Sequence, residues 1–233
     1  MISNELLFAL ALFGGLSISL GAFYLGRFFV FVLMVTITLY LGITEAKVIE
    51  VFGWPTTIGT ALFGVLMLST DMLSERYGRK AAFEVTFYSI FAVLCFQLFL
   101  KITLLAEATP DMQFMGEAMS TVYTTSFRMV FAGIFVFMVS QSLDIVLFYR
   151  IRQITGDKWL WARNKGSTIV SQGVDTYLFT FLAFYGLFDD WVLMATTNYC
   201  FKLVVAFSDT FFIYASKYIT PRDLKAPETI AAS

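Results

Sequence analysis

The sequence predicts an all-α, polytopic membrane protein with seven transmembrane helices, and three observations support this fold class. First, 58% of the 233 residues are hydrophobic and only 14% are charged, which is outside the range of water-soluble domains. Second, the chain contains seven stretches of about 20 mostly apolar residues, the length that crosses the hydrocarbon layer of a bilayer. Third, these stretches are continuously apolar and do not alternate, which favours helices over a β-barrel.

The seven predicted spans follow one another closely along the chain. Each is bounded by a short polar or basic segment that marks its end. The spans cover residues 5–25, 28–46, 56–75, 81–105, 127–150, 167–187 and 191–217. We therefore expect a multi-pass protein of the cytoplasmic (inner) membrane, with the lipid bilayer as its main surroundings.

The basic residues indicate the orientation of these spans. Of the 16 Lys and Arg residues, twelve lie in the loops on the face that carries the C-terminus, whereas only Lys47 and Lys101 lie on the opposite face. Arg128 and Lys202 lie within spans. Because positive charge collects on the cytoplasmic side, the N-terminus is predicted outside and the C-terminus in the cytoplasm.

The composition excludes several kinds of chemistry. The chain has no histidine, which removes the commonest general base and the commonest transition-metal ligand. Its two cysteines, Cys95 and Cys200, lie inside apolar runs, so they are interpreted as buried small hydrophobic residues. The net charge of −1 gives no indication of nucleic-acid binding. We therefore expect neither an enzyme nor a resident metal or cofactor.

Several ionisable and amide side chains lie within or next to the predicted spans. A charged group in the hydrocarbon costs about 2.5–3.5 kcal/mol on insertion scales, so each of these residues is a candidate for function. The candidates for substrate binding are Asp71, Glu75, Arg128, Gln141, Asp144, Gln172, Asp175, Asn198 and Lys202.

Four of these residues, Gln141, Asp144, Gln172 and Asp175, belong to an internal repeat. The pattern Val139-Ser140-Gln141-x-x-Asp144-x-x-Leu147-Phe148 recurs as Val170-Ser171-Gln172-x-x-Asp175-x-x-Leu178-Phe179. Consecutive spans run antiparallel, so the two copies are expected to face each other with reversed chain direction, as in the inverted repeats of many transporters. The alternative is a coincidence within the small alphabet of membrane sequences.

The depth of the acids predicts a shared site. At about 1.5 Å per residue, Asp144 and Asp175 lie roughly 10 Å from the cytoplasmic face, and Asp71 enters at a similar level. With Lys202 as cationic partner, such a site suits a cation or a substrate with several N–H donors. The alternative is that these groups only join helix to helix, although that role does not require ionisable side chains.

The outer segment 107–126 carries Met112, Met115, Met119 and Val122 at helical spacing. We expect a short amphipathic helix that lies on the outer surface, as a lid or as a connector.

Several motifs together resemble the queuosine precursor transporter family, which is also called the vitamin uptake transporter family. The resemblance runs from about residue 40 to residue 215. It is carried by Thr70-Asp71 with Glu75-x-Tyr77-Gly78, by Ser140-Gln141-x-x-Asp144-x-x-x-Phe148, by Trp161-x-Arg163-Asn164-x-x-Ser167-Thr168-x-x-Ser171-Gln172-x-x-Asp175-Thr176, and by Asn198-Tyr199-x-x-Lys202. It implies a six-helix core over 28–217 related to the substrate-binding components of energy-coupling-factor transporters. Residues 1–27 would form an additional helix, and 218–233 a cytoplasmic tail.

The resemblance also implies a function, the import of 7-deazaguanines such as preQ0, preQ1 or queuine for tRNA modification. The runner-up is a substrate-binding subunit that needs a separate ATPase, although the chain has no Ala-x-x-x-Ala pair of the kind often used for such docking. A membrane assembly protein is a further alternative. The sequence leaves the oligomeric state open, with a homodimer as one alternative.

The predicted orientation can be tested by cysteine labelling. In a background with Cys95 and Cys200 replaced by alanine, Asn4→Cys should react with an impermeant maleimide in intact cells. Ser233→Cys should react only after permeabilisation. Labelling of Asn4→Cys only from the cytoplasm would refute the seven-span topology.

Overall fold

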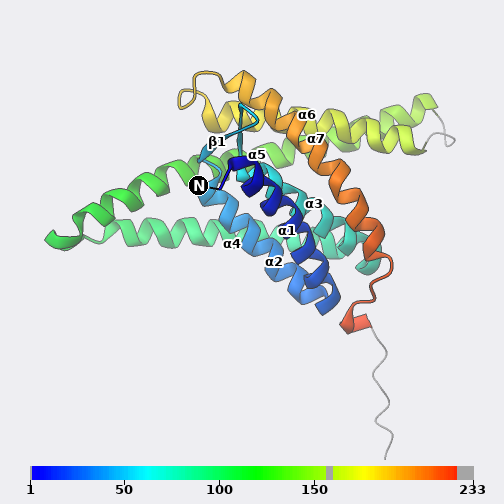
Figure 1. The fold of residues 1–233 in the computed structure, drawn as a ribbon, viewed down its shortest axis with the longest axis horizontal. Coiled ribbons are helices and arrows are strands. Elements are labelled where there is room, and N and C mark those ends of the chain that lie inside the picture. The colour runs from blue at the N-terminus through cyan, green and yellow to red at the C-terminus, as the bar shows by residue number, and fades with distance from the viewer. Residues whose placement is uncertain (1, 156–159, 225–233) are drawn as a thin grey trace, which may run out of the picture. The chain divides into compact units, whose positions relative to one another are not determined.

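The computed structural model describes residues 2–155 and 160–224 and contains seven α-helices within them (Figure 1). Side chains are described throughout these ranges except at 79, 141, 144–145, 148–149, 152, 155 and 160–168. The helices are α1 (Asn4–Leu25), α2 (Arg27–Thr44), α3 (Ile58–Tyr77), α4 (Arg79–Leu105), α5 (Gln113–Thr155), α6 (Leu160–Phe184) and α7 (Trp191–Ser216). Each contains or closely matches one predicted span, so the predicted all-α fold is confirmed.

Among the described residues, five helices are long and apolar enough to cross a bilayer by length and composition: α1, α2, α4, α5 and α7. Of the other two, α6 is apolar over Ile169–Phe184, the part with described side chains, and this part alone is shorter than a span. Both α3 and α6 carry polar residues predicted for the site. In α3 these include Asp71 and Glu75, and in α6 they include Gln172 and Asp175. Ionisable residues within a membrane-spanning helix are rare and usually functional.

The chain forms two compact units, and each is described by itself. The first unit comprises the described residues of Met1–Leu41, Ile58–Cys95 and Lys202–Ser233. The second unit comprises those of Gly42–Thr57 and Phe96–Phe201. Both α4 and α7 contribute one half to each unit.

Close packing of α1 against α3 builds the first unit. A Cβ atom on Gly15 would lie 2.6 Å from Cγ2 of Val65, so only glycine permits this approach of the two helices. One turn further along α1, the hydroxyls of Ser19 and Ser69 share a hydrogen bond of 2.7 Å and are fully buried. Small residues therefore bring the helices together, and a buried hydrogen bond sets their register.

The junction between α1 and α2 is held by a residue from the other end of the chain. Gly26 separates the two helices with φ 121°, a conformation that favours glycine. The Asp223 carboxylate accepts a hydrogen bond of 2.9 Å from the backbone N–H of Arg27, the first residue of α2, and another of 2.6 Å from the hydroxyl of Tyr77. Asp223 thus caps α2 from a distance and adds a negative charge at the positive end of its dipole.

A two-stranded antiparallel sheet in the second unit was not predicted from the sequence. It consists of β1 (Val48–Val51) and β2 (Trp54–Thr57), with Val51 paired to Trp54. The two loop residues, Phe52 and Gly53, have φ values of 53° and 76°. Positive φ at both central residues is the signature of a type I′ turn. The usual sequence signal of such a hairpin is Asn-Gly, whereas this loop is Phe52-Gly53, and phenylalanine rarely adopts a positive φ. The hairpin therefore could not be predicted from its turn.

The predicted short helix over 107–126 was wrong as a separate element. A single turn of 3₁₀ helix, η1 (Pro110–Met112), leads directly into α5, which continues for 43 residues without interruption. At about 1.5 Å per residue α5 is roughly 65 Å long, about twice the thickness of the hydrocarbon layer. No proline occurs between Pro110 and Pro221, so the segment contains no strong helix breaker.

The end of α4 and the start of α5 lie side by side in the second unit (Figure 1). Gln97 Nε2 donates to Ser126 Oγ at 3.1 Å, and Lys101 Nζ lies 5.5 Å from the ring centroid of Tyr123. The Met-containing segment is therefore one arm of a helical hairpin.

Loss of the remote cap should destabilise the first unit. We expect Asp223→Ala to lower the midpoint of thermal unfolding in detergent by the equivalent of about 1 kcal/mol, because a capping side chain typically contributes 0.5–2 kcal/mol. Asp189→Ala is the matched control. Asp189 is also an exposed acid, and its carboxylate accepts no hydrogen bond from the described residues. Equal midpoints for both variants would contradict the capping role.

Candidate functional site

The antiparallel contact of α5 with α6 brings the two copies of the internal repeat together. Ser140, in the first copy, donates a hydrogen bond of 3.2 Å from Oγ to Oδ1 of Asp175, in the second copy. At the opposite end of α6, Arg128 of α5 contacts Leu182 and Tyr185. The prediction that the two copies face each other with reversed direction is therefore confirmed at this pair.

The buried face of α6 is polar. Ser171, Thr176 and Thr180 are 3%, 2% and 0% exposed, although each carries a hydroxyl. Gln172 Oε1 and Thr180 Oγ1 are buried and have no hydrogen-bond partner among the described residues. A buried acceptor without a partner costs about 1–3 kcal/mol, so natural proteins rarely retain one without a use.

Side chains of α7 also form hydrogen bonds with α6. The hydroxyl of Tyr199 donates to the backbone carbonyl of Ile169 at 3.1 Å, and the hydroxyls of Tyr177 and Thr196 lie 2.8 Å apart. A buried apolar cluster joins the middle of α5 to α6 and α7 in the same unit. It is formed by Met129, Ala132, Ala183, Phe184 and Met194. The polar stripe of α6 therefore lies on a helix packed on two sides.

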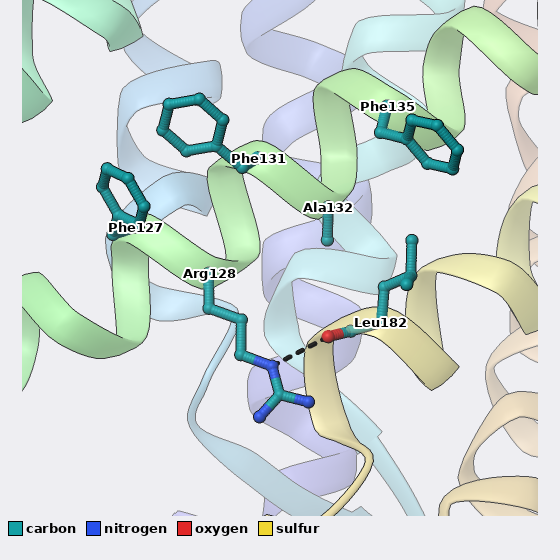
Figure 2. A pocket seen from close by; sticks show the side chains of 6 residues that line it. All are labelled: Phe127, Arg128, Phe131, Ala132, Phe135 and Leu182. Carbon is teal, nitrogen blue, oxygen red and sulfur yellow. Dashed lines mark hydrogen bonds between the residues drawn. The ribbon is translucent and has the colours of Figure 1, made fainter.

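Two predicted binding residues have structural contacts in the second unit. Asn198 is buried and accepts a hydrogen bond of 2.7 Å from Thr56 Oγ1, which attaches the β-hairpin to α7. Arg128 donates from Nε to the carbonyl of Leu182 at 2.8 Å (Figure 2). It also donates from Nη2 to the carbonyl of Tyr185 at 2.6 Å. These are among the last carbonyls at the end of α6, so Arg128 satisfies the helix C-terminus.

Three predicted residues belong to the first unit. Asp71 and Glu75 are exposed side chains, four residues apart on one face of α3. The ammonium of Lys202 lies 4.2 Å from the ring centroid of Phe63, which is the geometry of a cation–π contact. The expectation that carboxylates surround Lys202 stays a prediction.

The remaining two candidates, Gln141 and Asp144, have side chains outside the described residues, although their backbone belongs to α5. The structure thus brings together Ser140, Gln172 and Asp175 in the second unit. The convergence of the three acids at one depth stays a prediction, because Asp71 belongs to the other unit.

Some contributors were not selected from the sequence. Thr180 lies eight residues after Gln172, with Thr176 between them, so this stripe could have been found from its helical spacing. The contact of Phe63 with Lys202 could not be predicted, because the sequence does not distinguish Phe63 from the other apolar residues of its span. Thr56 was assigned to the start of a span, and its role depends on a hairpin that was not predicted.

A mainly helical membrane protein that buries polar, partly unsatisfied side chains between its packed helices has an architecture that small-molecule transporters share. Residues 57–216 match the family model described as "Putative vitamin uptake transporter". The chain therefore belongs to this family of transporters, as its motifs predicted.

Relatives from three bacteria agree with this assignment. The chain is 31% identical over 202 residues to a "Probable queuosine precursor transporter" of Bacillus subtilis, an alignment that covers 85% of this chain and 87% of the relative. A protein of the same description from Haemophilus influenzae is 28% identical, with 66% and 65% covered. The "Queuosine precursor transporter" of Escherichia coli is 26% identical, with 68% and 71% covered. No solved structure matches the chain.

A double-mutant cycle should reveal the anchor of the hairpin. We expect Thr56→Val and Asn198→Ala each to lower the free energy of unfolding, with a coupling of about 0.6–1 kcal/mol between them because they remove one buried hydrogen bond.

Thr196→Val is the matched control for Asn198→Ala. Thr196 lies two residues away on α7, is exposed, and shares its hydroxyl with Tyr177 and the carbonyl of Val192. It should show no coupling to Thr56→Val. Additive effects of Thr56→Val and Asn198→Ala would show that the hairpin does not depend on this bond.

Proposed function

We propose that this protein imports queuosine precursors across the cytoplasmic membrane, with its N-terminus outside, and that the polar face of α6 binds the 7-deazaguanine base. The family assignment and the names of the relatives support the transport of queuosine precursors. The observation that carries the binding site is the buried Oε1 of Gln172, which has no hydrogen-bond partner among the described residues.

The chemistry of a 7-deazaguanine fits this group of side chains. Its edge carries a ring N–H and an exocyclic amino group, which are donors, beside a carbonyl that accepts. Gln172 and Asp175 lie three residues apart and so on one face of α6, and together they present amide and carboxylate oxygens. The amide of Gln172 also carries donors for the carbonyl of the base. Ser140 fixes one oxygen of Asp175 and thereby orients the carboxylate.

The energetics favour a ligand with donors. The buried Oε1 of Gln172 has lost its hydration without gaining a partner among the described residues, and a bound N–H would supply that hydrogen bond. A site built this way rejects an analogue that lacks the matching donor, since its polar atom then stays unpaired. Hence 7-deazaguanine should compete for the site better than 7-deazahypoxanthine, which lacks the exocyclic amino group.

Replacement of the acids should weaken binding without loss of folding. Asp175→Asn and Asp144→Asn keep the size of the side chain but remove the charge that strengthens an N–H···O bond. A charge-assisted bond contributes about 1.5–3 kcal/mol, so each change should raise the Kd for the preferred base by roughly one to two orders of magnitude. Equilibrium binding of preQ0, preQ1 and queuine to purified protein measures this.

The control is Ser142→Ala, next to Ser140→Ala on the same helix. Ser142 is exposed and donates only to the backbone carbonyl of Met138, so its loss should leave binding unchanged. Ser140→Ala should weaken binding, because Asp175 loses a hydrogen bond that orients it. If both Asp variants fold and bind every base as tightly as the parent, the acids serve only to join helices. Uptake into liposomes that contain this chain alone, without an ATPase, separates the importer from a subunit of an ATP-driven system.

A further inference from the structure

Away from the polar face of α6, the second unit has an open cavity of about 520 Å³ on the surface of α5, lined also by Leu182 of α6 (Figure 2). Three phenylalanines follow one face of α5 at intervals of four residues. They are Phe127, Phe131 and Phe135, and their side chains are 41%, 46% and 50% exposed. The stripe is roughly 12 Å long, at about 1.5 Å per residue over eight residues. We call it the aromatic stripe.

The stripe begins beside a cation. Arg128 lines the same cavity, next to Phe127 in sequence and at the predicted start of the 127–150 span (Figure 2). No carboxylate of the described residues lies within ion-pair distance of its guanidinium, and its recorded hydrogen bonds are those to Leu182 and Tyr185. A guanidinium has five N–H donors, so these two bonds leave others for a second partner. The positive charge is offset only by the dipole at the end of α6.

The combination identifies one kind of ligand. A charged guanidinium at the end of a span attracts an anion, and its planar fork matches a phosphate. A free phosphate would gain nothing from three aromatic side chains, and a nucleobase is too short to cover a stripe of this length. A phospholipid has both parts, a phosphate at the level of the span's end and an acyl chain that runs along the helix.

We propose that Arg128 and the aromatic stripe bind one anionic phospholipid from the surrounding leaflet, with its phosphate on the guanidinium and an acyl chain along the three phenylalanines. The site depends on residues of the second unit only. It is separate from the polar face of α6, so it does not rest on the proposed binding of a 7-deazaguanine.

Native mass spectrometry of the full chain tests this. The protein is released from nanodiscs of equal parts phosphatidylglycerol and phosphatidylethanolamine, and the bound lipid is counted. The parent should retain one phosphatidylglycerol in preference to phosphatidylethanolamine. Arg128→Gln should lower that preference at least five-fold, and the double variant Phe131→Ala/Phe135→Ala should lower retention of both lipids.

The matched control is Phe207→Ala/Phe211→Ala on α7. These side chains are also four residues apart and are 75% and 79% exposed, but the structure records no arginine beside their rings among the described residues. This variant should retain lipid as the parent does. Addition of inorganic phosphate should not displace the lipid, because the acyl chain supplies part of the binding.

Because Arg128→Gln also removes a cap from α6, its folding is checked by size-exclusion chromatography and helical circular dichroism. If it does not fold, Arg128→Lys, which keeps the charge but not the planar fork, and the double phenylalanine variant decide the question. Retention and lipid preference equal to the parent in both, or an equal loss in the Phe207→Ala/Phe211→Ala control, would overturn the proposal.

Discussion

Polar groups inside a membrane protein must find their partners within the protein, because hydrocarbon offers none. The described structure meets this requirement at nearly every point where two helices touch. Ser19 bonds Ser69 between α1 and α3, and Ser140 bonds Asp175 between α5 and α6. Four buried side-chain atoms have no partner among the described residues: Ser89 Oγ, Gln97 Oε1, Gln172 Oε1 and Thr180 Oγ1. Of these, the proposed site uses Gln172 Oε1.

Helix ends pose the same requirement in a different form, since the first N–H groups and the last carbonyls of a helix have no partner within it. Two long-range contacts meet it here. Asp223 caps the start of α2, and Arg128 caps the end of α6. In both cases a charge lies at the end of the dipole that attracts it. The charge of Arg128 that caps α6 is also the charge on which the proposed phospholipid site depends.

The second unit shows how a small irregular element is accommodated among spans. The pairing of β1 and β2 satisfies the backbone groups that face each other within the β-hairpin, and Thr56 and Thr57 are fully buried. Its attachment uses side chains, from Thr56 to Asn198 and from the hydroxyl of Thr197 to the carbonyl of Pro55. Polar residues of α7 are thereby fixed at the side of the unit where the hairpin lies, which limits how many of them remain for a substrate.

The sequence by itself determined the seven spans and the approximate limits of most helices, because length and continuous hydropathy report directly on the crossing of a bilayer. It did not determine that α5 begins at Gln113, well before the predicted span 127–150. It also determined that the copies around Ser140 and Asp175 meet, because neighbouring spans connected by short loops run antiparallel. Only the tertiary structure decided which polar residues serve the fold. Asn198, Arg128 and Asp175 are all polar residues within apolar spans, so the sequence does not distinguish their roles. The roles of Asn198 and Arg128 depend on which hydroxyl or backbone carbonyl lies opposite them. These contacts form only when segments distant in sequence pack together, and the hydropathy of the sequence does not predict which residues then meet.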